Sequence, residues 1–525
     1  MATHGDDNHN ARRKFLTRSA TLVAAGAALP VLPALARNLR GQGNAGPAGA
    51  WPSAAALPVR RNINGPNGSA AAADLRAAIS AMMALPPTDP RNWYRQAMIH
   101  VLDCPHENAW FFPWHQGYLH WFERIARELT KNPSFALPYW DWTSDPSMPE
   151  AFFRRDLLDT QAQGFIHDWP TFDRTFRGPM EAFWGRRTVA QTQWLKMRGY
   201  TTFETFWAAV HGYFGVPTGR SLSAGNRLLP SPAFEAVSMP SLVNALAPSA
   251  FADFGGSMPA HHSIMATPGL LESQPHNMVH DAVGGFMGDM MSATDPVFWL
   301  HHCNIDRLWD IWMQRQGVHA VEGSHAWLVE PFLFFSAEDG IVRPVQTANH
   351  RFSSVAQGFS YEASQPIPAA LSRPANAAWP AESPCQLQST NLPINGSILV
   401  NAAPGEVACN AFLEGYPTAI EIELDYPDNP SAWHFKVEIK IDGDPSSAFE
   451  HCGYASFFGS MGAHPPGHAK HRGQLKIGIA DGMKKCLAGA RPGAQQFTIA
   501  VRAQRAGSSL PPDVLQVHRM DLISL

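Results

Sequence analysis

The sequence has few charged side chains, few cysteines and no apolar run of membrane-spanning length. Charged residues make up 16% of the 525 residues, and 40 basic against 44 acidic side chains give a net charge of −4. Nucleic acids and anionic membranes attract clustered positive charge, so this balance argues against both as partners. The 45% of apolar residues suffices for a sizeable core, which excludes a chain that is disordered throughout.

The cysteines form neither a disulfide scaffold nor a CxxC pair. There are 6 of them in 525 residues, too few for a disulfide-rich domain. Without a CxxC pair, a thioredoxin-like or zinc-ribbon function has no support. No internal repeat is present either, which excludes a repeat architecture.

Proline, glycine, histidine and tryptophan are abundant. The 44 prolines and 41 glycines indicate many turns and long loops. The 23 histidines and 17 tryptophans are both high for a globular chain of this length. Histidine is the commonest metal ligand, so the surplus predicts a metal site without identifying its members.

The first 36 residues have the pattern of an export signal. Arg12 and Arg13 are followed by a basic, then apolar stretch, and a weakly apolar run extends over residues 20–35. A small-x-small sequence allows cleavage before Arg37. We therefore predict that residues 1–36 are a twin-arginine signal and that the protein is periplasmic or secreted, with a disordered basic tail as the alternative.

The remaining chain divides by pattern into four parts. Residues 37–58 form a flexible lead-in, residues 59–365 a mainly helical catalytic domain, residues 366–395 a Pro/Ala-rich linker and residues 396–525 an antiparallel β domain. Helical periodicity predicts helices at 72–84, 91–103, 114–130, 202–213, 275–283 and 302–315. Alternating apolar and polar residues predict strands at 420–424, 435–441, 474–477 and 497–501.

Two groups of histidines lie within the helical part. His100, His106 and His115 form the first, among many aromatic residues. Three neutral imidazoles satisfy a borderline metal such as copper or zinc. In the second group, His276 and His280 are four residues apart and therefore share one face of a helix.

The second group continues in a further helix that contains His301 and His302. Asp306 follows His302 by four residues, so we expect its carboxylate on the same face, as a partner for the histidine ring. Asn277 follows His276, so the glutamate of a zinc-protease HExxH motif is absent. An isolated HxxxH also occurs on solvated helices, but two such groups in one region favour a metal centre.

These motifs resemble those of bacterial tyrosinases in the polyphenol oxidase family, which have a type-3 copper centre. Residues 112–119 are similar to the first copper motif of the family, with Gln116 where arginine is commoner. Further segments that match the family are residues 137–142, 272–280, 295–309 and 358–361, the last with Phe359 where tyrosine is common. The resemblance covers roughly residues 59–361.

The resemblance implies a four-helix bundle that holds two copper ions. It makes His100, His106 and His115 the ligands of one ion, and His276, His280 and His302 those of the other, with His301 a packed neighbour. It also implies a thioether between Cys104 and the ring of His106; the alternative for Cys104 is a small buried thiol.

The implied reaction uses O2 as co-substrate. Monophenols are hydroxylated at the ortho carbon, and o-diphenols are oxidised to o-quinones. In the family a glutamate and an asparagine are thought to hold a water that accepts the phenol proton, and Glu272 and Asn277 stand at these positions. The alternative is that Glu272 has a purely structural role. The gate over the second copper aligns with Met290 or Met291.

Residues 396–525 resemble the β-sandwich of plant polyphenol oxidases and molluscan haemocyanins. In those relatives an apolar side chain of this domain stands in for substrate, which makes Phe457 or Phe458 the candidate plug here. A stabilising or oligomerising domain is the alternative.

Three functional classes remain at this stage. The resemblance favours a tyrosinase acting on small phenols and catechols. A catechol or o-aminophenol oxidase without hydroxylase activity is the nearer rival, and a haemocyanin-like oxygen carrier the remote one. A homo-oligomer and a copper chaperone are partners that the sequence leaves open.

Overall fold

The computed structural model describes residues 57–214 and 219–362 and a set of strand segments beyond them. These segments are 385–388, 392–393, 397–401, 418–425, 433–441, 448–458, 472–479, 496–505 and 516–524. Ser53–Leu525 form one compact unit. The predicted export signal, most of the lead-in and most of the predicted linker lie outside the described residues. Among the described residues, no helix is both long enough and apolar enough to cross a membrane.

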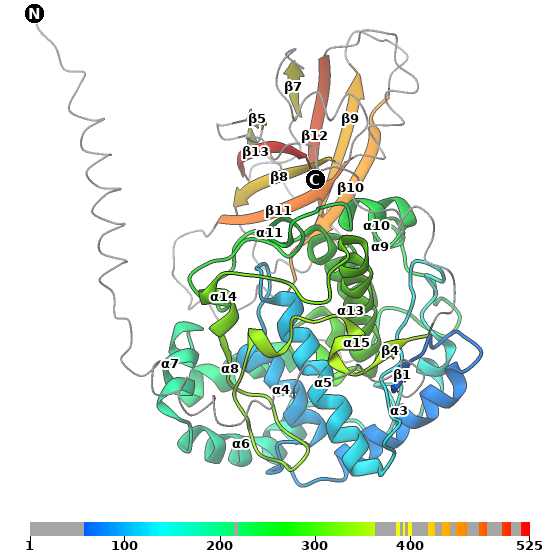
Figure 1. Cartoon of the computed structure of the whole chain (residues 1–525), viewed down its shortest axis with the longest axis vertical. Helices are drawn as coiled ribbons and strands as arrows, with labels where there is room; N and C mark the ends of the chain where they lie inside the picture. The colour runs from blue at the N-terminus through cyan, green and yellow to red at the C-terminus, as the bar shows by residue number, and fades with distance from the viewer. Residues whose placement is uncertain are drawn as a thin grey trace, which may run out of the picture. The chain divides into compact units, whose positions relative to one another are not determined.

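The helical part is built from long helices joined by short ones (Figure 1). The longer ones are α3 (Gly68–Met83), α4 (Trp93–Asp103), α5 (Phe111–Thr130), α6 (Trp169–Gly185), α7 (Val189–Met197), α8 (Phe203–Phe214), α12 (Asn277–Val283) and α13 (Pro296–Gln316). The shorter helical segments are η2 (Glu150–Phe153), α9 (Ala233–Ala236), α10 (Met239–Ala245), α11 (Phe251–Phe254), η3 (Glu272–His276), η4 (Gly285–Gly288), η5 (Ser292–Thr294), α14 (His325–Val329), η6 (Thr347–Asn349) and α15 (Ser354–Gln357). The predicted helices are confirmed, whereas α6 and α7 were not predicted.

Local caps fix where the histidine-bearing helices begin. The Asn92 side chain accepts a hydrogen bond from the backbone of Tyr94 at the start of α4. At α13 the carboxylate of Asp295 accepts from Val297 N, and Pro296 occupies the first turn. Helix α13 therefore begins six residues before the predicted start at 302, which places His301 and His302 in its second turn.

Four two-residue strands pair within the helical part. Strand β1 (Val59–Arg60) pairs in parallel with β4 (Ser360–Tyr361), and β2 (Pro331–Phe332) pairs with β3 (Val345–Gln346). Because β1 and β4 lie near the two ends of the helical part, their pairing joins those ends.

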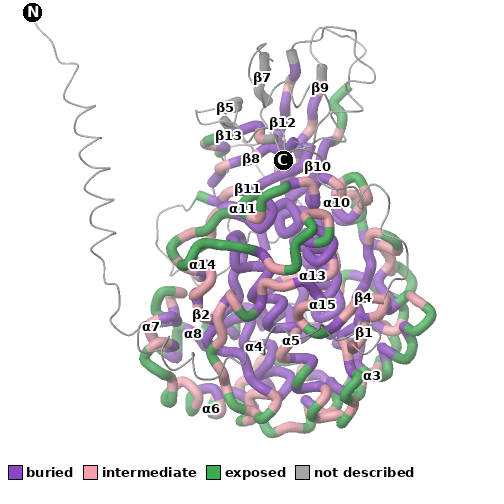
Figure 2. The backbone as a smooth tube through the Cα atoms, viewed as in Figure 1, coloured by how far each residue is buried: buried purple, intermediate pink, exposed green. Residues whose placement is uncertain are grey.

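The core of the helical part is apolar and rich in aromatic rings. Figure 2 shows the interior of this part as buried. Helix α13 has only four residues that are not buried. The ring centroids of Phe122 and Trp299 lie 4.0 Å apart, which packs α5 on α13.

The remaining strands form two antiparallel sheets. One has the order β10 (Glu450–Ser456), β9 (Trp433–Ile441), β12 (Gln496–Arg505) and β7 (Ser397–Asn401). The other has the order β11 (Arg472–Gly478), β8 (Thr418–Asp425), β13 (Gln516–Ser524) and β5 (Cys385–Gln388), with β6 (Leu392–Pro393) also on β13. Their inward-facing residues share one apolar core, and the predicted strands are confirmed as parts of β8, β9, β11 and β12.

Candidate metal centre

The first histidine group comes from two helices and the loop between them. His100 lies in the last turns of α4, His106 in the connecting loop and His115 near the start of α5. One ligand atom from each of these residues and from Cys104 lies within 4.8 Å of the others, and all four residues are buried. The structure therefore brings together the three histidines that the sequence assigned to one metal ion.

The second group comes from η3, α12 and α13. His276 ends η3, His280 lies in α12, and His301 and His302 lie in α13. Ligand atoms of all four lie within 4.8 Å of one another. Sequence reasoning placed His301 outside this set as a packed neighbour; the structure places its ring in the group, with the indole N–H of Trp142 3.3 Å from His301 Nδ1.

The two groups lie side by side. The rings of His115 and His302 stack with centroids 4.1 Å apart and an interplanar angle of 11°. The centroids of His106 and His276 are 5.9 Å apart. One compact site can therefore hold two ions facing each other.

Hydrogen bonds to Nδ1 fix the tautomers of four of these histidines. Backbone carbonyls accept from three: Met290 for His100 (2.8 Å), Phe111 for His115 (2.8 Å) and Met287 for His280 (2.7 Å). The side-chain oxygen of Asn277 accepts from the fourth, His276, at 2.8 Å. Each Nδ1 therefore carries the proton, and each Nε2 keeps a lone pair, the arrangement seen in metal-ligating histidines.

Several histidine nitrogens in the site are buried and have no hydrogen-bond partner. They are Nε2 of His100, His276 and His301 and Nδ1 of His106 and His302. Leaving a buried polar atom without a partner costs free energy, and a metal ion removes that cost for a lone pair. His100 in the first group and His276 in the second donate from Nδ1 and so have a partnerless lone pair on Nε2, which fits a metal ion in each group. Nitrogen-only sites suit copper or zinc.

Burial keeps these imidazoles neutral. It lowers the pKa of His100 and of His276 to about 3. Burial and neighbouring histidines also lower the pKa of His106, His115 and His302 well below the usual value. Neutral imidazole is the protonation state that binds a metal, so the site is ready to bind at neutral pH.

Three phenylalanine rings enclose the histidines. Phe111 of α5 lies 4.7 Å from His276, and Phe298 of α13 lies 4.2 Å from His302 (ring centroids). Phe458, which follows β10, stacks on His280 with centroids 3.9 Å apart. The walls are apolar and exclude water, which strengthens electrostatic interactions inside.

The two plug candidates point in different directions. The ring of Phe458 also lies 5.3 Å from His106 and 5.7 Å from His276, so it covers both groups. Phe457 belongs to the apolar core of the strands, with its ring 5.6 Å from Phe435. Of the two, Phe458 has the position expected of a plug.

Glu272 and Asn277 lie at the edge of the second group. Glu272 Oε1 accepts a 2.6 Å hydrogen bond from Glu107 N, and its Oε2 is buried without a partner. Burial raises the pKa of the Glu272 carboxyl well above its usual value. Asn277 Nδ2 donates to the carbonyl of Ser456, at 2.6 Å.

The structure gives Asp306 other partners than the predicted one. Asp306 does not hold His302: its carboxylate accepts from Gln116, Arg60 and Tyr361, and His302 Nδ1 is partnerless. Asp306 lies four residues after His302 in α13, as expected. Its carboxylate, however, is bound by the buried guanidinium of Arg60, at 2.8 Å. This prediction is therefore wrong.

The gate predicted at Met290 or Met291 and the thioether predicted at Cys104 remain predictions. Both methionines belong to the apolar core, and the carbonyl of Met290 serves His100 of the first group. Cys104 is a free thiol in the structure, with Sγ 3.9 Å from His106 Nε2 and 3.4 Å from His115 Nε2. Burial raises its pKa, which leaves it protonated and unreactive as a nucleophile.

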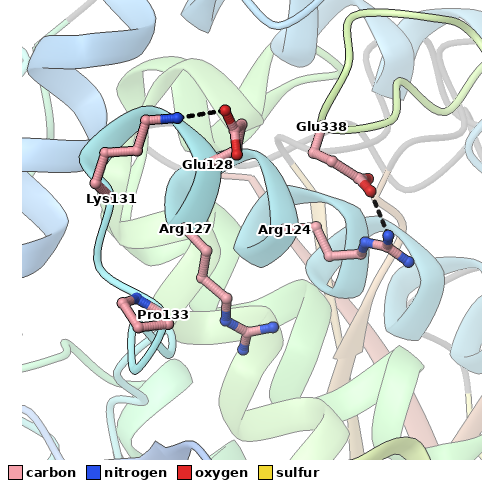
Figure 3. Close-up of a pocket in the computed structure, with 6 residues that line it drawn as sticks. All are labelled: Arg124, Arg127, Glu128, Lys131, Pro133 and Glu338. Atoms are coloured by element: carbon pink, nitrogen blue, oxygen red, sulfur yellow. Dashed lines mark hydrogen bonds and ion pairs between the residues drawn. The ribbon is translucent and has the colours of Figure 1, made fainter.

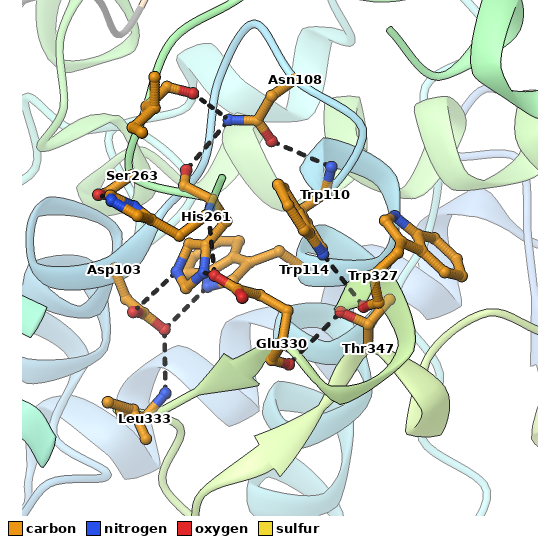
Figure 4. Close-up of polar contacts among 12 residues, drawn as sticks. Asp103, Asn108, Trp110, Trp114, His261, Ser263, Trp327, Glu330, Leu333 and Thr347 are labelled. Atoms are coloured by element: carbon orange, nitrogen blue, oxygen red, sulfur yellow. Dashed lines mark hydrogen bonds and ion pairs between the residues drawn. The ribbon is translucent and has the colours of Figure 1, made fainter. Parts of the chain in front are cut away.

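Sequence reasoning missed a buried polar network beside the first group (Figure 4). His262 Nδ1 lies 2.8 Å from Glu330 and Nε2 lies 3.2 Å from Asp103, the last residue of α4. Asn108 Nδ2 donates to the carbonyls of His106 and His262. The network thus ties the loop of His106 to a segment 150 residues away, and no local motif around His262 indicates this.

A surface pocket lies away from the histidines, at the C-terminal end of α5 (Figure 3). Its charged side chains pair with one another, Arg124 with Glu338 and Lys131 with Glu128. Arg127 donates to the carbonyl of Phe135 at 2.8 Å. These charged groups already have partners within the chain, and the residues that line the pocket belong to neither histidine group.

Comparison with known proteins finds a match in the part of the chain that carries both histidine groups. Residues 89–315 match the common central domain of tyrosinase. A latent-form polyphenol oxidase of Prunus armeniaca is 26% identical over 302 residues (52% of this chain and 43% of its own), and a tyrosinase of a Hahella species is 28% identical over 287 residues (53% and 51%). The chain thus spans about half the length of these relatives.

Two solved structures share the fold. A latent aurone synthase (polyphenol oxidase) matches with a TM-score of 0.58 and 19% identity over 91% of each chain. A latent apple tyrosinase matches with a TM-score of 0.54 and 19% identity, over 91% of this chain and 99% of that one. A mainly helical core followed by antiparallel strands is therefore an architecture that polyphenol oxidases also have.

Proposed function

We propose that the protein is a copper-dependent oxidase of small phenols, with one copper ion in each histidine group. His100, His106 and His115 would hold the first ion, and His276, His280 and His302 the second. The observation that carries this proposal is the pair of adjacent, buried groups of neutral imidazoles, each with one ligand atom per residue within 4.8 Å of the others. The central-domain match over residues 89–315 supports copper over zinc.

The copper pair would supply O2 binding and electron transfer from the phenol. The chain's own part is to hold the imidazoles and keep the site dry. Backbone carbonyls orient the rings of His100, His115 and His280, and the rings of Phe111 and Phe298 exclude water. Substrate phenols and catechols would enter over His280, where Phe458 now lies.

Tyrosinase activity is the finer proposal, because hydroxylation of a monophenol also needs its proton removed. Glu272 Oε2 is an acceptor without a partner, and Asn277 follows the ligand His276 directly. A carboxylate and an amide that fix one water form a general base for this step. A diphenol oxidase without hydroxylase activity is the alternative.

The remaining assignments complete the proposal. Helices α4, α5, α12 and α13 carry four of the six ligands and would form the four-helix bundle of a catalytic domain spanning residues 59–365. Residues 396–525 would be a β-sandwich that shields the copper pair through Phe458, joined by a linker at 366–395. The protein would be exported with a twin-arginine signal at 1–36 and a loop at 37–58.

Glu272→Gln in copper-loaded protein tests the hydroxylase role. The substitution preserves shape and removes the base, so hydroxylation of a monophenol should fall about 100-fold, whereas oxidation of a diphenol should change less than threefold. Equal loss of both activities contradicts the proton-acceptor role. Because Phe458 covers His280, these activities are compared in the Phe458→Ala background. Oxidation of diphenols alone there indicates a catechol oxidase, and oxidation of neither class of phenol indicates an oxygen carrier.

The proposed thioether has its own test in the peptide that contains Cys104 and His106. Formation of the bond removes two hydrogens and two electrons, which copper with O2 would accept. Protein loaded with copper in air should therefore yield a peptide lighter by two hydrogens than the unloaded protein does. Alkylation of Cys104 after denaturation would show a free thiol and remove the thioether from the account.

A further inference from the structure

The end of β10 touches the second histidine group at two separate points. The ring of Phe458 stacks on His280, with centroids 3.9 Å apart. Two residues earlier, the carbonyl oxygen of Ser456 accepts the 2.6 Å hydrogen bond from Asn277 Nδ2. All four residues are buried, so neither contact competes with water.

The hydrogen bond from Asn277 defines the orientation of its amide. A carbonyl can only accept, so the amide nitrogen faces Ser456 and the amide oxygen faces His276 Nδ1, at 2.8 Å. One N–H and one lone pair of the amide are thereby used, and the two bonds fix the plane of the amide. A relay of hydrogen bonds runs from His276 through Asn277 to the backbone of β10.

Further contacts hold the strands against η3. Ser273 Oγ donates to the carbonyl of Lys476 at 2.7 Å, and Gly478 N donates to Gln274 Oε1 at 3.3 Å. The approach is close because Gly453 has no side chain: a Cβ there would lie 2.9 Å from Gln274 Nε2. These contacts hold β10 and β11 against η3, next to the carbonyl of Ser456.

We infer that the C-terminal strands restrain the site in two separable ways, one of which is selective for monophenols. The ring of Phe458 blocks entry of every phenol. The carbonyl of Ser456 holds the amide of Asn277 against β10 and fixes its plane, so that the amide cannot turn to share a water with Glu272. This inference rests on the proposed function, because it assigns Asn277 a part in proton removal.

The selectivity follows from what each reaction needs. Hydroxylation forms a new C–O bond and requires an acceptor for the phenol proton, which a locked amide does not help Glu272 to position. Oxidation of a diphenol removes electrons and protons without a new C–O bond and depends less on this pair. Removing only the ring of Phe458 should therefore release the diphenol reaction first.

Hydrogen exchange in the full chain without copper tests the captured amide directly. Asn277→Leu preserves volume and removes the donor, so exchange in residues 448–458 should become about tenfold faster. Glu272→Gln is the matched control, because Glu272 binds Glu107 N and should leave this segment unchanged. Wild-type exchange at 448–458 in Asn277→Leu overturns the inference.

Activity of the copper-loaded full chain tests the separation. Phe458→Ala should raise diphenol oxidation about tenfold and leave a low ratio of monophenol to diphenol kcat/KM. Adding His451→Ala and Gln474→Ala, which remove contacts of the strands to Glu235 (2.8 Å) and Thr267, should then raise this ratio about tenfold as β10 loosens.

The outcomes separate the two proposals. An equal ratio in the Phe458→Ala and triple variants, with diphenol oxidation present, overturns the selective restraint and leaves the proposed function intact. Copper-loaded variants that oxidise no phenol at all contradict the proposed function itself.

Discussion

The two histidine groups are built from the same side chain but are enclosed differently. Around the first, buried polar contacts such as those of Asn108 and His262 tie the loop of His106 to other parts of the helical region. The second is covered most closely by β10 and by Phe458, whose ring lies 3.9 Å from His280 and 5.3 Å from His106 of the first group. This cover comes from a segment about 140 residues beyond the end of α13. The first group is thus fixed by the core, and the second is fixed partly by a cover.

This difference separates two requirements of the site, the fixed orientation of the metal-binding imidazoles and the entry of a substrate. A site that must hold a metal benefits from imidazoles that are oriented by packed surroundings. A site that must also admit a substrate needs one wall that is not part of the same core. The second group has such a wall, and we therefore expect substrate to approach from the side of His280.

The largest effect is expected from removing one ligand on either side. His115→Ala in the first group and His280→Ala in the second should each lower copper content by about one ion per chain. Each should also lower phenol oxidation about 1,000-fold, equivalent to roughly 4 kcal/mol of transition-state stabilisation. Metal analysis and initial rates on the same preparations measure both. Full activity in either variant would show that this group is not a copper site.

The next effect compares two phenylalanines whose rings lie near His276, Phe111 at 4.7 Å and Phe458 at 5.7 Å between centroids. Phe111 lies in the core, so Phe111→Ala should lower the free energy of unfolding by roughly 3–5 kcal/mol. Phe458→Ala opens the cover and should raise activity at a smaller cost in stability. Denaturant unfolding followed by tryptophan fluorescence measures the cost. Similar costs in both variants would indicate that Phe458 belongs to the core in the same sense as Phe111.

The smallest effect concerns pH and the first group. Burial opposes the charged form of His262, but hydrogen bonds to Asp103 and Glu330 outweigh it and raise the pKa of His262 above its usual value. A raised folded-state pKa contributes stability that is complete below the unfolded pKa, about 6.5, and is lost as pH rises through the folded value.

His262→Gln should therefore destabilise the protein by roughly 1–3 kcal/mol at pH 6 and by less at pH 9. Thermal unfolding of wild type and variant at both pH values gives the difference. His167, whose ring is part-buried and bonds the carbonyl of Thr160, serves as a control remote from the network. A pH-independent difference for His262→Gln would mean that its charge does not stabilise the fold.

Much of the site is predictable because its spacing is local. The i,i+4 pair His276 and His280 must share a helix face whatever surrounds them. The helix of His100 and the helix of His115 follow from apolar periodicity, with boundaries off by a few residues. Local pattern therefore suffices to place two histidine groups in one helical region.

Long-range partners are not predictable in this way. Asp306 lies on the expected face, yet Arg60, 246 residues away in sequence, binds its carboxylate. Phe457 and Phe458 are equivalent as residues, and only the geometry at the end of β10 decides which one faces the histidines. His262 has no motif, because both carboxylates that bind it come from distant segments.

The metal content of the purified full chain tests the central claim most directly. The protein is loaded with equal amounts of copper and zinc and then desalted. Inductively coupled plasma mass spectrometry then measures the number of copper and zinc ions per chain. The account predicts about two copper ions and almost no zinc, since copper binds nitrogen ligands more tightly. One copper ion per chain, or zinc in both positions, would contradict it.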